Sequence, residues 1–241
     1  MEVFVEMEKI IYFAAPMFNL GDLSFNVFLN DKLEEKGFRT FFPQRDGFEF
    51  GGLTKELESY LQGDDILEAV KNIIWTLDVG VFIKNSDAVL ARCDEPLDPG
   101  VDVELGVARF GYNKSIVGYR TDVRSPYITG KKTFGGMHTF PGMLMDEFIN
   151  YFPDWKITGP GKLELAVNSL VNEIVPALRT SLKKIKPNVD SLVVSRIESV
   201  AQLLFEGMDV SYNSEGNVQR VAQRYAENIE DIRRVYDTEF I

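Results

Sequence analysis

The 241-residue sequence contains one cysteine, Cys93, and one histidine, His138. A single cysteine cannot form an internal disulfide, and such low cysteine use is typical of a reducing compartment. A zinc site needs several Cys and His ligands, which this sequence does not supply. A Ser-His-Asp triad would have to use His138, and no nucleophile-elbow motif accompanies it. We therefore expect neither a disulfide framework nor a triad hydrolase, and we expect no metal and no organic cofactor.

Basic residues and long apolar runs are also scarce. The chain has 26 Lys and Arg residues against 37 Asp and Glu residues, which gives a formal net charge of −11. Nucleic-acid binding relies on clustered Lys and Arg side chains, so this charge argues against DNA or RNA as a partner. No apolar run approaches the roughly 20 residues that span a bilayer. Glu2, Glu6 and Glu8 interrupt the apolar N-terminal segment, which is unlike a signal peptide. We expect a cytoplasmic protein that binds no membrane and acts on an uncharged small molecule.

What remains is an ordinary globular composition, with 45% hydrophobic and 26% charged residues. Segments rich in β-branched and aromatic residues alternate with segments of helical periodicity, a pattern typical of βαβ units with a parallel sheet. We therefore predict a doubly wound, flavodoxin- or Rossmann-like α/β fold, whose ligand site lies at the carboxyl ends of the strands. The predicted strands are Lys9–Ala15, Arg39–Pro43, Ala88–Cys93 and Ser115–Tyr119, and the predicted helices are Asn19–Lys36, Asp64–Leu77 and Val101–Phe110.

The rest of the chain is predicted to be loop and helix. Residues 44–63 are rich in glycine and acidic residues and predict a long loop with some helix. Beyond Gly161, three consecutive segments each carry one apolar helical face. The first would complete the α/β core, and the last two would form an appended hairpin. This division predicts a catalytic domain over residues 1–184 and a C-terminal helical extension over residues 185–241.

Side chains that can do chemistry follow the predicted strands. Tyr12 lies late in the first strand, Asp87 precedes the strand that starts at Ala88, and Asp98 lies in the loop after that strand. Glu104 is predicted in the first turn of the next helix, where the helix dipole favours an ionised carboxylate. An ionised carboxylate is what nucleophilic attack on a sugar carbon requires. Each residue also has a structural explanation, as a dipole complement, a turn former or a core aromatic.

Three segments taken together resemble the nucleoside 2-deoxyribosyltransferase family. Residues Ile11–Phe18 place a tyrosine at the end of the first strand, as that family does, and Asp87-Ala88-Val89 matches a second segment. Residues Asp98–Ala108 match the family motif D-x-G-x-x-x-E-[LIV]-G-x-A. Residues Phe41–Phe48 are similar to the base-side loop of these enzymes, and Tyr119–Asp122 is similar to a segment of the bacterial and archaeal branch. The resemblance covers roughly residues 8–180.

The resemblance implies a role for each matching residue. Glu104 matches the nucleophile that attacks C1′ of deoxyribose, and Tyr12 matches the residue that positions it. Asp98 matches the group that binds the 5′-hydroxyl end of the sugar, and Asp87 matches a candidate proton donor near the base. An incoming nucleobase then attacks from the same face, so two displacements retain the configuration. Further substrate-binding residues expected from the matching segments are Phe18, Phe13, Asp46 and Gly100.

Two positions refine the expected activity. Family relatives that hydrolyse nucleoside 5′-monophosphates carry a serine where this sequence has Asp98, whose carboxylate would repel a phosphate. We therefore expect unphosphorylated 2′-deoxynucleosides and free nucleobases as substrates. Gly142 stands where family members carry an asparagine that reaches the neighbouring subunit's sugar pocket. The resemblance implies a homo-oligomer, and the missing asparagine keeps open an N-glycosidase that uses water as the acceptor. A non-catalytic nucleoside sensor is a third interpretation.

Several other residues have two interpretations. His138 follows Gly135-Gly136 in a segment that predicts a flexible loop, and it would either line the site or lie on the surface. Arg92 and Arg120 are expected to form structural ion pairs with nearby acids. Asp94, Asp98 and Asp102 are spaced by four residues, which does not fit a calcium loop.

Overall fold

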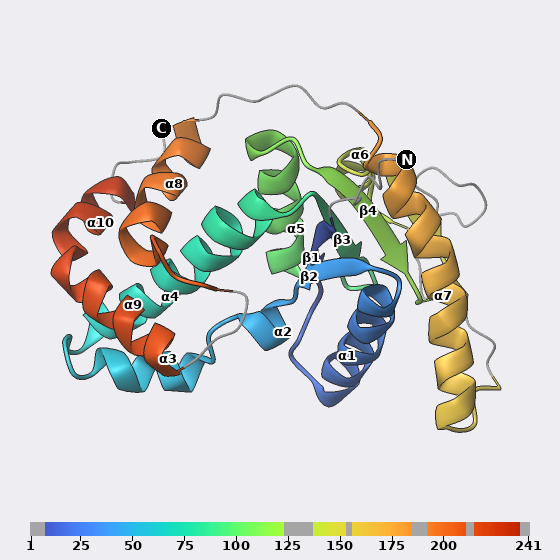
Figure 1. Cartoon of the computed structure of the whole chain (residues 1–241), viewed down its shortest axis with the longest axis horizontal. Coiled ribbons are helices and arrows are strands. Elements are labelled where there is room, and N and C mark those ends of the chain that lie inside the picture. The colour runs from blue at the N-terminus through green and yellow to red at the C-terminus, as the bar shows by residue number, and fades with distance from the viewer. Residues whose placement is uncertain (1–7, 123–136, 153–155, 185–191, 211–214, 237–241) are drawn as a thin grey trace, which may run out of the picture. The chain divides into compact units, whose positions relative to one another are not determined.

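A computed structural model describes residues 8–122, 137–152, 156–184, 192–210 and 215–236 of the chain (Figure 1). The chain forms two compact units, each built from two stretches of sequence. Unit 1 comprises residues 1–41 and 85–188, and unit 2 comprises residues 42–84 and 189–241. Within the described parts, no helix is both long enough and apolar enough to cross a membrane.

Unit 1 contains a five-stranded parallel sheet with the strand order β2-β1-β3-β4-β5. Both neighbours of β1 pair with it in parallel, and Tyr12 lies opposite Phe41 on one side and Val89 on the other. This is the flavodoxin-like order, which reverses direction between β1 and β3. The predicted fold class is therefore confirmed. The strands are β1 (Lys9–Ala14), β2 (Phe38–Phe41), β3 (Ala88–Arg92), β4 (Ser115–Arg120) and β5 (Glu147–Asn150).

Helices cover both faces of this sheet. The β1-to-β2 and β3-to-β4 connections run in opposite directions along the sheet, so right-handed crossovers place α1 (Leu20–Glu35) and α5 (Pro99–Gly106) on opposite faces. The π-helical segment η2 (Val107–Gly111) continues α5. The long helix α7 (Pro160–Ser181) packs beside α1 (Figure 1) and also contacts β4 and β5. The fully buried side chains of this core include Ile11, Leu29, Leu33, Val89, Leu90, Ile116, Val117, Val171 and Ile174.

Unit 2 is entirely helical in its described residues. The π-helical segment η1 (Thr76–Ile83) packs against α8 (Leu192–Phe205). Gly80 makes this possible, because a Cβ at Gly80 would lie only 2.9 Å from Ile197 and 3.1 Å from Ala201. The helix α3 (Phe50–Leu57) packs against α9 (Glu215–Glu227), and the Asn72 side chain donates a hydrogen bond to the Tyr225 hydroxyl at 2.9 Å. The elements of unit 2 are α2 (Pro43–Asp46), α3 (Phe50–Leu57), α4 (Asp64–Trp75), η1 (Thr76–Ile83), α8 (Leu192–Phe205), α9 (Glu215–Glu227) and α10 (Ile229–Tyr236).

The structure differs from the sequence prediction in several elements. The second strand ends at Phe41 and not at Pro43, because Pro43 is the first residue of α2. The strand β5 was not predicted, since its four residues mix polar and apolar side chains. The third C-terminal apolar face is divided between α9 and α10, which separate at Asn228. The C-terminal helices pack with the helices of residues 42–84, whereas the sequence predicted a separate hairpin. The predicted domain boundary at residues 184 and 185 stays a prediction.

Candidate active site

A tyrosine and a glutamate meet at the carboxyl edge of the sheet. Tyr12 is fully buried in β1, and its hydroxyl group donates a hydrogen bond to Oε1 of Glu104 at 2.7 Å. Glu104 lies on α5, the helix that follows β3. The pair therefore joins the two strands between which the strand order reverses, where ligands bind in open α/β sheets. The structure thus brings together two of the three residues expected to be catalytic.

The helix that carries Glu104 begins earlier than predicted. Pro99 is its first residue, and the Asp98 side chain caps it by accepting hydrogen bonds from the backbone of Gly100 at 2.9 Å and Val101 at 3.1 Å. Glu104 therefore lies in the second turn, and the prediction of a first-turn position was wrong. The physical reason is that Pro99 and the Asp98 cap together form a strong helix start. The Glu104 carboxylate is instead held by the hydrogen bond from the Tyr12 hydroxyl group.

The residues expected to bind the sugar and the base lie in different environments. Phe18 follows β1 and is 79% exposed, a placement compatible with a ring that covers a ligand. Phe13 is buried in β1 and packs against Tyr119, with ring centroids 6.5 Å apart, so it belongs to the core. Both capping bonds of Asp98 use Oδ1, and Oδ2 takes part in neither. Gly100 is tightly placed, because a Cβ there would lie 2.8 Å from Asp98 Oδ1.

The carboxylates of two expected site residues, Asp87 and Asp46, are engaged in contacts with other residues. Asp87 lies at the amino-terminal edge of the sheet, where its carboxylate pairs with Lys9 at 2.9 Å and accepts the backbone N–H of Ile10 at 2.8 Å. Asp46 belongs to unit 2. Its buried carboxylate accepts hydrogen bonds from the Arg45 side chain at 2.7 Å and from the Phe42 backbone at 2.9 Å. Both carboxylates are therefore held in structural contacts.

An ion-pair network links several elements at the carboxyl edge of the sheet, near the Tyr12–Glu104 pair. Arg92, at the end of β3, bonds Asp22 of α1 at 2.9 Å and Asp94 at 2.7 Å. Asp94 in turn accepts the backbone N–H groups of Thr121 at 2.6 Å and Asp122 at 2.9 Å, beyond the end of β4. The network ties α1, β3 and β4 together. The expectation of a structural ion pair at Arg92 is confirmed.

Arg120 is the largest fully buried side chain at this edge. Its Nε donates to the backbone oxygen of Asp122 at 2.8 Å, and its Nη1 lies 3.7 Å from Oε1 of Glu95. Neither Nη atom has a hydrogen-bond partner among the described residues. Arg120 thus pairs with an acid, as expected, through a long contact.

The sequence analysis did not identify Asp78, a titratable residue with a raised pKa. Asp78 lies in η1 of unit 2, and burial raises the pKa of its carboxyl group from 3.8 to about 7. The signal was present in the sequence, because Asp78 is the single charged residue of the apolar stretch Trp75–Ile83. A partly buried carboxyl group whose pKa is raised toward neutral pH is either a functional group or a destabilising one. Among the described residues, no group of three or more His, Cys, Asp or Glu side chains is placed to hold a metal ion.

Comparison with known proteins identifies the family. The family model for nucleoside 2-deoxyribosyltransferase matches residues 11–152, which is more than half of the chain. The chain belongs to the nucleoside 2-deoxyribosyltransferase family. The match includes Tyr12, Asp98 and Glu104, and it supports a deoxyribosyltransferase-like enzyme with nucleoside and nucleobase substrates at the level of the family.

A solved structure of a conserved protein from Enterococcus faecalis V583 is similar to this member of the family, with 18% sequence identity and a TM-score of 0.41. The similarity covers 68% of this chain and 99% of that one. A search of curated proteins found no significant match.

Proposed function

We propose that this protein transfers 2-deoxyribose between nucleobases through a covalent intermediate on Glu104. The observation that carries the proposal is the 2.7 Å hydrogen bond between the Tyr12 hydroxyl and Glu104 at the carboxyl edge of the sheet. A buried tyrosine has few rotamers open to it, so this bond holds one carboxylate oxygen in a fixed place. A fixed, ionised carboxylate is suited to attack a sugar carbon.

The proposed reaction has two displacements. Glu104 attacks C1′ of a 2′-deoxynucleoside, an ester bond forms, and the C1′–N bond breaks as the departing base takes up a proton. A nitrogen of the second base then attacks C1′, the ester bond breaks, and that nitrogen loses a proton. The carboxylate is restored, and the configuration at C1′ is retained after two inversions.

Asp98 is the proposed partner of the sugar's 5′-hydroxyl group. It lies six residues before Glu104, at the start of the same helix, and its Oδ2 is not used by the two capping bonds. A carboxylate accepts hydrogen bonds from a hydroxyl group and repels a phosphate. The proposed substrates are therefore unphosphorylated deoxynucleosides, and the exposed Phe18 is the proposed cover for the base. Asp87 is not part of the proposal, because it is paired with Lys9 at the other edge of the sheet.

A chromatographic assay tests the proposal. Purified protein is incubated with deoxyadenosine, with and without free cytosine, and bases and nucleosides are quantified. We expect deoxycytidine to form only when cytosine is present. Glu104→Gln should abolish turnover, because an amide is a poor nucleophile. No turnover in the wild type, with intact nucleoside binding, would contradict the proposal and favour a sensor.

The same assay separates transfer from hydrolysis. Gly142 is buried in α6 (Thr139–Met143) and carries no side chain that could reach a neighbouring site. This observation supports the second candidate, an N-glycosidase with water as the acceptor. Adenine release without any deoxycytidine would identify that activity. A homo-oligomeric state, which the resemblance implies, is part of the proposal, and light scattering in solution would test it.

A further inference from the structure

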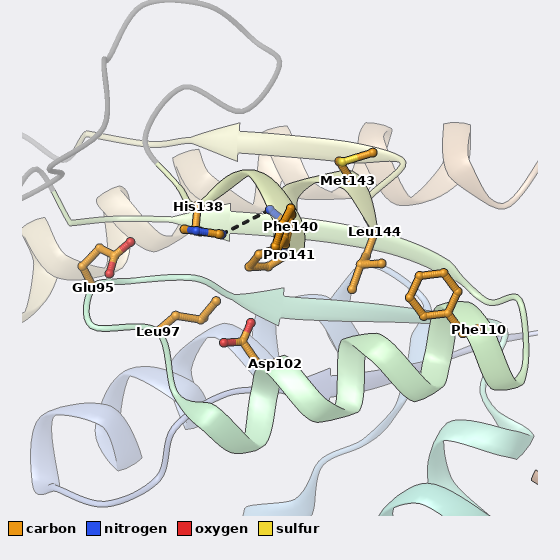
Figure 2. Close-up of a pocket in the computed structure, with 9 residues that line it drawn as sticks. All are labelled: Glu95, Leu97, Asp102, Phe110, His138, Phe140, Pro141, Met143 and Leu144. Atoms are coloured by element: carbon orange, nitrogen blue, oxygen red, sulfur yellow. Dashed lines mark hydrogen bonds between the residues drawn. The ribbon is translucent and has the colours of Figure 1, made fainter. Parts of the chain in front are cut away.

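The hollow between α5 and α6, drawn in Figure 2, belongs to a face that the proposed homo-oligomer would cover. Its lining includes Pro141 and Met143, on either side of Gly142, and the family resemblance places this segment against a neighbouring subunit. Glu95, which also lines it, is already paired with Arg120 at 3.7 Å. The exposed apolar side chains of this hollow are therefore expected where two copies of the chain meet.

A second cavity, of about 430 Å³, lies at the amino-terminal edge of the sheet in unit 1. It is lined by the starts of β1 and β2, at Lys9 and Phe38, and by the ends of α1 and α7. Pockets that hold small organic ligands usually have volumes of about 300 to 1,000 Å³. The Tyr12–Glu104 pair lies at the opposite edge, so a ligand in this cavity would not compete for space with a nucleoside at Glu104.

Basic side chains dominate the lining of this second cavity. Lys36 follows α1, Arg179 lies in the last turn of α7, and Lys183 lies two residues beyond that helix. In the parts of the chain that the structure describes, these three exposed side chains form no ion pair and no hydrogen bond. The fourth cation, Lys9, is paired with Asp87 at 2.9 Å. Three positive charges therefore remain available to a ligand.

Negative groups at the cavity offset only part of this charge. Among the described residues that line it, Glu8 is the only carboxylate. The carboxyl-terminal ends of α1 and α7 each carry about half a negative charge, which favours cations beside them. The three unpaired cations supply more charge than Glu8 and the two helix ends together, so the cavity favours an anion.

The charge of the whole chain limits the size of that anion. The formal net charge of −11 repels extended polyanions, such as a nucleic acid or an anionic membrane surface. A compact anion responds mainly to charges within the Debye length, which is about 10 Å at 0.1 M ionic strength. Lys and Arg side chains both form strong, charge-assisted hydrogen bonds with phosphate oxygens. A short chain of phosphate groups can contact cations from two helix ends at once.

We propose that this cavity is a second binding site, which takes a compact oligophosphate anion. Lys36, Arg179 and Lys183 donate hydrogen bonds to its phosphate oxygens, and the anion binds at the edge of the sheet opposite to Glu104. Free oligophosphate and the phosphate chain of a nucleotide share this chemistry. The site does not depend on the proposed transfer of deoxyribose.

Isothermal titration calorimetry with tripolyphosphate tests the proposal. At about 0.01 M ionic strength, where the Debye length is roughly 30 Å, we expect one tripolyphosphate per chain. Inorganic phosphate should bind at least about tenfold more weakly, because it engages fewer cations. Lys36→Gln and Arg179→Gln should each weaken the affinity about threefold, as is usual for the loss of one exposed ion pair. Adenosine triphosphate distinguishes the two sources, because tighter binding than tripolyphosphate would identify a nucleotide as the ligand.

Glu8→Gln provides a test of opposite sign. It removes the carboxylate that lines the cavity, so the affinity for tripolyphosphate should increase about threefold. A gain in affinity cannot result from a folding defect, which makes this variant independent of the stability of the others.

Matched substitutions in unit 2 separate the cavity from the overall charge. Lys71→Gln and Arg220→Gln each remove one exposed cation, and Glu58→Gln removes one exposed carboxylate. These variants change the net charge of the chain by the same amounts as the cavity variants, but none of the three residues lines the cavity. They should therefore leave the affinity for tripolyphosphate nearly unchanged.

Three results would overturn the proposal. Equal effects of the cavity variants and their controls would show that only the overall charge attracts the anion. Phosphate that binds as tightly as tripolyphosphate would show that the cations do not act together. A single-stranded oligonucleotide that binds more tightly than tripolyphosphate would identify an extended nucleic-acid surface. Because calorimetry with these anions measures no turnover, failure of the deoxyribosyltransferase assay would leave this second site intact, and the reverse also holds.

Discussion

The hydroxyl group of Tyr12 donates to Oε1 of Glu104 at 2.7 Å, and this bond joins residues 92 positions apart. Tyr12 is held by the sheet core, because it is fully buried between β2 and β3. Glu104 is held by a helix that begins at a proline and an aspartate cap. Two rigid elements, the strand β1 and the helix α5, therefore hold this carboxylate at the carboxyl edge of the sheet, without the help of a loop.

Tyr12→Phe removes this hydrogen bond and keeps the buried ring. We expect kcat for deoxyribose transfer to fall about tenfold to a hundredfold, the range given by the loss of one hydrogen bond to a charged group. Steady-state kinetics with deoxyadenosine and cytosine would measure it. Tyr119→Phe is a matched control, since the buried Tyr119 hydroxyl has no hydrogen-bond partner in the described residues. Equal losses in both variants would show that the effect is structural.

Asp98 caps the helix α5, and substitutions can separate this role from the proposed binding of the sugar's 5′-hydroxyl group. Asp98→Ala removes the helix cap, so the free energy of unfolding should fall by about 1 kcal/mol. Asp98→Asn keeps an oxygen that caps the helix but removes the charge, so stability should be nearly unchanged. If Asp98 binds the 5′-hydroxyl group, KM for the deoxynucleoside rises in both variants. Urea denaturation and kinetics together test this, and an unchanged KM would limit Asp98 to its capping role.

Asp87→Asn tests the proton donor that the family resemblance implied. Asp87 is paired with Lys9 at the amino-terminal edge, and both side chains are partly exposed. We expect kcat to change by less than about twofold and the free energy of unfolding to fall by less than about 1 kcal/mol, as is usual for an exposed ion pair. A fall of kcat by two orders of magnitude in a stable variant would instead support the implied role.

Asp78 predicts a specific dependence of stability on pH. Its pKa is raised from 3.8 to about 7 by burial, so the folded state holds a proton that the unfolded state has lost between these values. Stability should therefore decrease as the pH rises through this window, by about 3 kcal/mol between pH 5 and pH 8. Asp78→Asn should remove this loss and be the more stable protein at pH 8. Urea denaturation of both proteins at the two pH values measures the difference, and parallel pH curves would contradict the expectation.

Local signals explain which parts of the fold were predictable. The strands at Lys9, Ala88 and Ser115 are apolar and buried on both faces, so their composition alone indicates them. The strand at Glu147 has four residues of mixed polarity, and only its pairing with β4 makes it a strand. The helical unit was not predicted, because residues 42–84 and 189–241 meet through contacts that no local pattern encodes.

The candidate site also combines features that local sequence indicates with features that depend on contacts between distant residues. The sequence by itself determined the fold class, the family motif from Asp98 to Glu104 and the tyrosine at the end of the first strand, because each depends on residue type and short spacing. Only the tertiary structure decided that Tyr12 reaches Glu104, that Asp87 lies at the other edge, and that basic residues at the ends of α1 and α7 meet at one cavity. The physical reason is that side-chain direction depends on where a helix begins and how its sheet is ordered. Those properties arise from contacts between residues far apart in the chain.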